Sequence, residues 1–162
     1  MSIYYKEGES YDGKAHHAII SKQDGSISQE IHIPYDVVKA PFVQKGEAIA
    51  VATVRPIIPY QEKWLLVETS SDTVYSYTPG ENKLCPFLVK KPSVDPERLL
   101  TMGVVTERYY FMQTIGKVFN FEKGRGFPTV DLMYDKQEDA VYKAAVLNEE
   151  SNPVIMLMKR KK

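Results

Sequence analysis

The stretch WLLVETSSDTVYSYTPGENKLCPFLV, residues 64–89, decides the fold class. It holds short runs rich in β-branched and aromatic residues, which are typical of strands. Polar turn sequences separate these runs, first Ser70-Ser71-Asp72 and then Pro79-Gly80-Glu81-Asn82. Short strands joined by short turns pair with their neighbours in an antiparallel sense, so the stretch predicts a meander.

The same pattern extends in both directions along the chain. Upstream, Asp24-Gly25 lies between alternating apolar segments, which indicates a hairpin because the tight primed turns need a positive φ. The further strands that the pattern predicts cover residues 48–54, 108–114, 130–134, 140–146 and 153–158. Only residues 96–100 predict a helix, with Asp95 as its cap and Pro96 at its first position. The chain is therefore predicted to be an antiparallel all-β protein.

Composition narrows the classes of function. The 162 residues suit one domain, and 43% hydrophobic with 26% charged residues is a globular proportion. Lys+Arg and Asp+Glu both number 21, and this balance argues against a nucleic-acid partner. The basic end, Lys159 to Lys162, is interpreted as a solvated tail. No apolar run approaches the ~20 residues of a membrane-spanning helix, and Met1 to Gly8 lack a leader peptide, so the chain as written is expected in the cytoplasm.

Several segments resemble one known family of proteins. They are Asp24-Gly25 followed by Glu30 to Tyr35, then Ser71 to Tyr77, Pro86 to Val89, Arg108 to Thr114, Gly126 to Leu132, Tyr134 to Glu138 and Asn152 to Leu157. Together they are similar to the six-bladed β-propeller proteins of Gram-negative gut bacteria, many of them lipoproteins without an assigned function. A meander recurring about every 40 to 45 residues fits propeller blades, although a β-sandwich or a small barrel fits the repeat equally well.

The resemblance implies an incomplete propeller. Six blades of ~40 residues need roughly 240 residues, so this chain supplies about three blades plus a final strand. We expect an N-terminal extension at 1–14, the propeller-like domain at 15–159 and the basic tail at 160–162. Because an open ring leaves the faces of its end blades wet, we expect self-association or a protein or glycan partner. Family members are exported, which would place the protein at the cell envelope.

Function is predicted to be non-catalytic binding or scaffolding. Propeller ligands meet the loops at one end, here predicted at 34–36, 55–60 and 123–127. The alternatives are a metal-dependent lyase or hydrolase completed by a second chain, and a non-functional truncated paralogue. No catalytic, cofactor-binding or metal residue is predicted, and no cofactor.

The residues that could carry chemistry have structural interpretations. His16-His17 alternate across a strand and cannot chelate from one face, and His32 lies between apolar residues on the opposite face. Asp131 could act as an acid–base group with Asp135, but Asp135 is better interpreted as a turn former. Gly124-Arg125-Gly126 lacks the Gly-Lys-Ser/Thr of a phosphate loop.

Three further features also admit structural interpretations. Ser70 and Ser71 lie in a turn without the setting of a nucleophile. Cys85, the only cysteine, is interpreted as an apolar filler that cannot form an internal disulfide. The tyrosines offer stacking faces for a glycan or a peptide, but they are also ordinary strand and core residues. The tyrosines singled out are Tyr35, Tyr60, Tyr75, Tyr77, Tyr109 and Tyr110.

Overall fold

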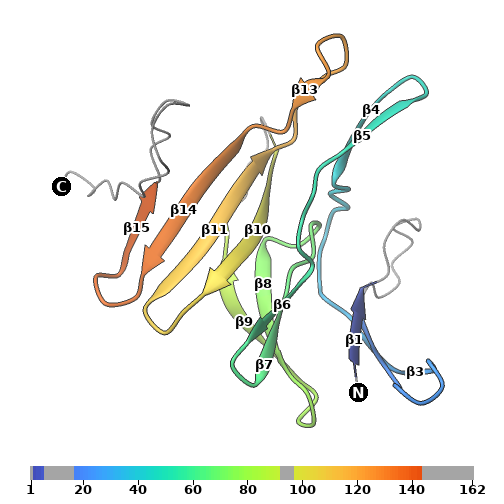
Figure 1. The fold of residues 1–162 in the computed structure, drawn as a ribbon, viewed down its shortest axis with the longest axis vertical. Helices are drawn as coiled ribbons and strands as arrows, with labels where there is room; N and C mark the ends of the chain where they lie inside the picture. The colour runs from blue at the N-terminus through green and yellow to red at the C-terminus, as the bar shows by residue number, and fades with distance from the viewer. Residues whose placement is uncertain (1, 6–16, 92–96, 144–162) are drawn as a thin grey trace. The chain divides into compact units, whose positions relative to one another are not determined.

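A computed structural model describes residues 2–5, 17–91 and 97–143. Within these ranges the chain forms strands, turns and loops and no helix, and every strand pair is antiparallel (Figure 1). The all-β, antiparallel prediction is therefore confirmed. The described part of the chain also contains no helix long and apolar enough to cross a membrane.

The described residues fall into two compact units. The first comprises the described residues of Met1–Pro41 and Val54–Pro92, and the second those of Phe42–Thr53 and Ser93–Lys162. Each unit contains one four-stranded sheet whose strands follow one another in chain order.

The four-stranded sheet of the first unit is the meander that residues 64–89 predict. Its strands are β6 (Ile57–Tyr60), β7 (Lys63–Leu66), β8 (Thr73–Thr78) and β9 (Lys83–Val89), hydrogen-bonded in that order. Asn82 has φ 50° and Gly80 has φ 89°, so the β8–β9 turn uses the left-handed conformations that glycine and asparagine accept best.

A three-stranded sheet packs against this meander. It consists of β1 (Ser2–Tyr5), β2 (His17–Ile20) and β3 (Ile27–Ile31), and the predicted Asp24-Gly25 turn joins β2 to β3. Gly25 has φ 74°, and the Asp24 carboxylate accepts hydrogen bonds from the backbone and hydroxyl of Ser26. The shared core is buried and apolar, and its members are Ile19, Ile31, Ile33, Leu66 and Tyr77.

The second unit repeats the four-stranded plan with an insertion. The sheet contains β10 (Arg98–Val105), β11 (Tyr109–Gly116), β14 (Thr129–Asp135) and β15 (Ala140–Lys143). The small hairpin of β12 (Phe119–Asn120) and β13 (Arg125–Gly126) is inserted between β11 and β14. A separate two-stranded hairpin consists of β4 (Phe42–Lys45) and β5 (Ala48–Val51).

Two local predictions are wrong. Arg98 to Leu100 belong to β10 and not to a helix, because their backbones pair with residues 114–116 of β11. Residues 57–60, predicted as part of a binding loop, form strand β6. Of the predicted extension at 1–14, residues 2–5 form β1, while residues 1 and 6–14 lie outside the described residues. So do Asp95, Pro96, the predicted final strand at 153–158 and the basic tail.

Candidate binding face

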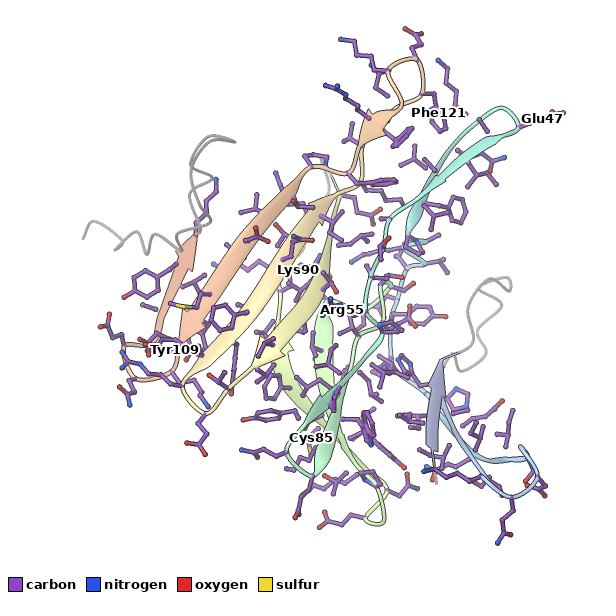
Figure 2. All side chains as sticks on the ribbon, viewed as in Figure 1. Glu47, Arg55, Cys85, Lys90, Tyr109 and Phe121 are labelled. Atoms are coloured by element: carbon purple, nitrogen blue, oxygen red, sulfur yellow. The ribbon has the colours of Figure 1, made fainter. Side chains whose placement is uncertain are left out.

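One row of side chains crosses three strands of the second unit's sheet. Tyr110 on β11 lies directly opposite Tyr134 on β14, and Tyr134 lies opposite Val141 on β15. Directly opposite residues of antiparallel strands point to the same side, so these three side chains share one face. The two tyrosine rings lie 5.6 Å apart between centroids and are tilted by 42°, within the range of a favourable aromatic pair. Figure 2 shows the side chains of this sheet, with the neighbouring Tyr109 labelled.

The same face continues along β14. Leu132 and Val130 alternate with Tyr134 along the strand, and Leu132 lies opposite Met112. Met112 is buried, whereas Val130, Leu132, Tyr110 and Tyr134 are only half-buried and Val141 is 52% exposed. We call this partly uncovered set the tyrosine face; its residues are Tyr110, Val130, Leu132, Tyr134 and Val141.

Charged groups border the tyrosine face at its turn end. The ammonium of Lys136 lies 5.0 Å from the centroid of the Tyr110 ring, in the range of a cation–π contact. The Tyr134 hydroxyl donates a 2.8 Å hydrogen bond to Asp139 Oδ1. That bond, made to the protonated phenol, raises the pKa of Tyr134 above its ordinary value. The face therefore combines aromatic and aliphatic area with a cation and a carboxylate at its border.

An ion pair joins the two turns beside this face. Arg108, just before β11, contacts the Asp135 carboxylate with Nη2–Oδ2 at 2.7 Å and Nε–Oδ2 at 3.1 Å. Asp135 also accepts a hydrogen bond of 2.9 Å from the backbone of Gln137. The Arg108 hydrogen bonds lower the pKa of Asp135 against the opposing effect of burial, and the Gln137 amide adds to the lowering. Asp135 is thus a turn former, as predicted, with an ion pair that the sequence did not reveal.

Asp131 is not brought together with Asp135 as a catalytic pair would be. Asp131 is exposed and accepts a 2.7 Å hydrogen bond from Gln113 Nε2. Asp135 is buried and held by Arg108. Each carboxylate therefore has its own structural partner.

The six tyrosines that the sequence offers as stacking faces differ in burial and contacts. Tyr77 is 2% exposed in the core, and its single hydroxyl proton lies within reach of Gln29 Oε1 and Asn82 Oδ1, so it cannot offer a stacking face. Tyr75 packs against the same core. The remaining first-unit tyrosines are half-buried, with Tyr60 edge-on to Phe87 at 5.6 Å and Tyr35 in a loop.

Tyr109 and Tyr110 point to opposite faces of their sheet because they are consecutive strand residues. The Tyr109 ring lies against the Arg108 guanidinium, 4.9 Å from centroid to carbon. Tyr134 was not singled out from the sequence. Its signal was the period-two alternation of Val130, Leu132 and Tyr134, which marks one face but does not tell whether that face is covered.

His32 has the environment that alternation predicts. His32 is exposed between the buried residues Ile31 and Ile33, and its Nε2 lies 3.7 Å from a Glu30 carboxylate oxygen. His17 is buried, with Nε2 3.1 Å from the Pro56 carbonyl, to which it donates. His16 lies outside the described residues. Among the described residues no three His, Cys, Asp or Glu side chains are grouped so that they could hold a metal ion.

The β7–β8 loop is polar, buried and structural. Ser70 Oγ accepts a 3.0 Å hydrogen bond from the Lys39 backbone, and Ser71 Oγ accepts one from the backbone of Thr73. Asp72 binds the ammonium groups of Lys39 at 2.9 Å and Lys90 at 3.0 Å. Burial raises the pKa of Asp72, but the two lysines outweigh it and the pKa is lowered. These contacts tie the loop to neighbouring segments.

The remaining candidates also take structural positions. Gly124, with φ 58°, lies in the turn of the β12–β13 hairpin, and Arg125 and Gly126 form β13. The Phe119 ring contacts Phe121 and Phe127, at 5.0 Å and 5.4 Å between centroids. Cys85 is half-buried on β9, labelled in Figure 2, and its carbonyl accepts a hydrogen bond from Ser76.

The chain matches no protein-family model, no curated protein and no solved structure.

Proposed function

We propose that the protein is a non-catalytic binding or scaffold module of β-propeller type. In this proposal the two four-stranded meanders are successive blades, because a propeller blade is a four-stranded antiparallel sheet whose strands follow chain order. Their first strands begin at Ile57 and Arg98, a separation that fits a repeat of about 40 to 45 residues. The three-stranded sheet β1–β3 would represent an incomplete third blade, and the β4–β5 hairpin would stand outside the blades.

The tyrosine face is the observation that carries the binding role. Tyrosine is enriched at protein interfaces because its ring supplies large apolar area and its hydroxyl tolerates water. The half-buried pair Tyr110 and Tyr134, the exposed Val141 and the bordering Lys136 offer such a surface. In an unclosed series of blades, one face of the last sheet has no further blade packed on it. The incomplete propeller would therefore leave the tyrosine face available to a partner.

The polar side chains support binding over catalysis. Two of the chain's carboxylates are held by cations: Asp72 by Lys39 and Lys90, and Asp135 by Arg108. A catalytic acid or base needs a pKa near the working pH. Both aspartates instead have pKa values lowered further from neutrality.

The experiment is a ligand screen with the full chain. The purified protein is presented to a phage-displayed peptide library and to a printed glycan array. We expect a peptide or glycan whose binding is weakened at least ~30-fold by Tyr134→Ser or Tyr110→Ser, because buried tyrosine anchors at interfaces are commonly worth ~2 kcal/mol.

A matched control is Tyr60→Ser, which removes a half-buried tyrosine from β6 in the other unit. This variant should bind the selected ligand as the unchanged chain does. A selected ligand whose affinity is changed by neither Tyr134→Ser nor Tyr110→Ser would overturn the role of the tyrosine face. Stoichiometric metal in the purified protein, measured by elemental mass spectrometry, would instead favour a metal-dependent enzyme.

A further inference from the structure

The β4–β5 hairpin is half the size of the chain's main sheets. In the part of the chain that the structure describes, β5 pairs with β4 alone, while the meanders each have four strands. An isolated two-stranded hairpin is at best marginally stable in water. One side of it also presents uncovered apolar side chains, with Phe42 37%, Ile49 58% and Val51 61% exposed. The hairpin therefore has fewer strands than the main sheets and an apolar side that is left largely exposed.

The sequence of β5 lacks the charged residues and prolines that often protect an edge strand from pairing. Residues 48–54, Ala-Ile-Ala-Val-Ala-Thr-Val, contain no charge, proline or glycine, which is the pattern of a segment that adds to other strands. The edges of the first meander carry Pro59 on β6 and Pro86 on β9, and a proline blocks pairing because it has no N–H. Edge strand β10 has a register shift between Met102 and Val105.

The hairpin geometry shows which backbone groups face that edge. Gly46 and Glu47 form a two-residue loop between the opposite residues Lys45 and Ala48. The pair that flanks such a loop exchanges hydrogen bonds, and every second pair does so along an antiparallel ladder. The N–H and C=O groups of Ala48 and Ala50 are thus used toward β4. Those of Ile49 and Val51 point to the open edge.

We propose that β5 pairs antiparallel with β5 of a second copy of this chain. A two-fold axis at Ala50 places Ile49 of one copy opposite Val51 of the other, so that all outward backbone groups of both residues are paired. The product is the four-stranded antiparallel order β4-β5-β5-β4, the size of the chain's own meanders. Ile49 and Val51 of the two copies then form cross-strand pairs on one face.

A second copy fits this edge better than an unrelated strand because the segment is complementary to itself. Its centre bears no charge that a two-fold axis would set against itself, and small Ala50 lies on the axis. The opposite edge of the hairpin is less suitable because β4 ends in Lys45 and follows Pro41. With few backbone hydrogen bonds gained, the pairing is expected to be weak and dependent on concentration.

A cysteine cross-link tests the register. Residues opposite each other on the axis form a non-hydrogen-bonded pair with Cα atoms ~4.5 Å apart, which a disulfide can bridge. Ala50→Cys in a Cys85→Ser background should therefore form a disulfide dimer on mild oxidation. The control is Val43→Cys in the same background. Val43 lies opposite Ala50 within the hairpin but on the other strand, so this variant should remain mostly unlinked. Equal cross-linking of the two variants would overturn the proposal.

Proline variants test the backbone pairing. Val51→Pro removes an N–H from the open edge of β5 and leaves the bonds to β4, whereas Gln44→Pro makes the same change on the β4 edge. Sedimentation velocity over a concentration series should show Val51→Pro fixed near 18.5 kDa, while the unchanged chain and Gln44→Pro rise toward a dimer. Val51→Lys, at an exposed position, should repeat the result without a backbone change.

A monomer at all concentrations, or a dimer that Val51→Pro and Val51→Lys leave intact, would refute the inference. It does not rest on the tyrosine face, because β5 shares no residue with it. A Val51→Pro variant that still binds the ligand selected by the face would show that the two surfaces act separately.

Discussion

At the scale of single residues, the third strand of each meander has a carboxylate at one end that fixes a neighbouring segment. Asp72 directly precedes β8 and binds Lys39 and Lys90, and Asp135 is the last residue of β14 and binds Arg108. Side-chain exposure falls to 4% for Asp135 and is 24% for Asp72. A buried carboxylate loses water, so it is stable as an anion only with such partners.

Asp135→Asn tests this role through its pH dependence. The folded-state pKa of Asp135 is lowered, so its contribution to stability is fully present above the unfolded pKa of ~3.9 and is lost as pH falls through the folded value. We therefore expect Asp135→Asn to be less stable than the unchanged chain at neutral pH. The difference should shrink toward zero in acid. Urea unfolding at a series of pH values measures both curves.

The control for this change is Asp131→Asn, which alters an exposed carboxylate on the same strand. It should change stability by no more than ~0.5 kcal/mol. A stability difference for Asp135→Asn that stays constant from neutral pH down to acid would mean that the carboxylate charge is not what holds the two turns together.

The turn role of Asp135 could be predicted from sequence, because aspartate favours local backbone bonds in turns. Its ion pair could not. Arg108 is distant along the chain, and the two residues meet only because β11 pairs with β14 in the register that sets Tyr109 opposite Asp135. The role of a single residue is thus predictable where its partners are close in sequence. Where the partners are distant in sequence, the role depends on which strands pair.

At the scale of elements, strong turn signals predicted turns correctly, whereas the edge strands β6 and β10 were not predicted. The Asp24-Gly25 hairpin formed where the sequence placed it. Residues 97–100 were misassigned because Asp95 and Pro96 resemble a helix start, while pairing with β11 decides the outcome. Strand β6 was missed because Pro59 argues against a strand. A proline is tolerated there because β6 lies at the edge of its sheet.

Gly126→Ala tests the close packing of the β12–β13 hairpin. A Cβ at Gly126 would lie 2.5 Å from the Cα of Phe119 and 2.6 Å from the Val118 carbonyl oxygen. Both atoms are backbone, so the strands must move apart. We expect a loss of ~1–3 kcal/mol and weaker contacts between the Phe119 and Phe127 rings. Urea unfolding and aromatic NOEs report the two effects.

Arg125→Ala is the matched control, since Arg125 is the exposed neighbour on the same strand. It should leave both readouts close to those of the unchanged chain. If Gly126→Ala keeps full stability and unchanged aromatic NOEs, the strands of this hairpin lie further apart than the structure gives.

At the scale of the whole molecule, the sequence repeat predicted recurring meanders but not which strands of each sheet correspond. An acidic residue precedes an apolar residue and a tyrosine both at 72–75 and at 138–142. The first case begins the third strand of its sheet, whereas the second begins the fourth. The inserted β12–β13 hairpin shifts the later strands of the second meander. The tyrosine face was hidden for the same reason, because it forms only when β11 and β14 pair across that insertion.

Solution scattering tests the propeller proposal on the full chain. A compact domain of 162 residues has a radius of gyration of about 15 Å. Blades set side by side in an unclosed ring would instead form a broad arc, with a larger radius and more long interatomic distances. The Val51→Pro variant at the lowest measurable concentration separates this effect from dimers, which would also enlarge the particle. A radius that stays at the compact value in that variant would favour a small barrel or sandwich over blades of an open ring, because closing the sheets on one another is what shortens the particle.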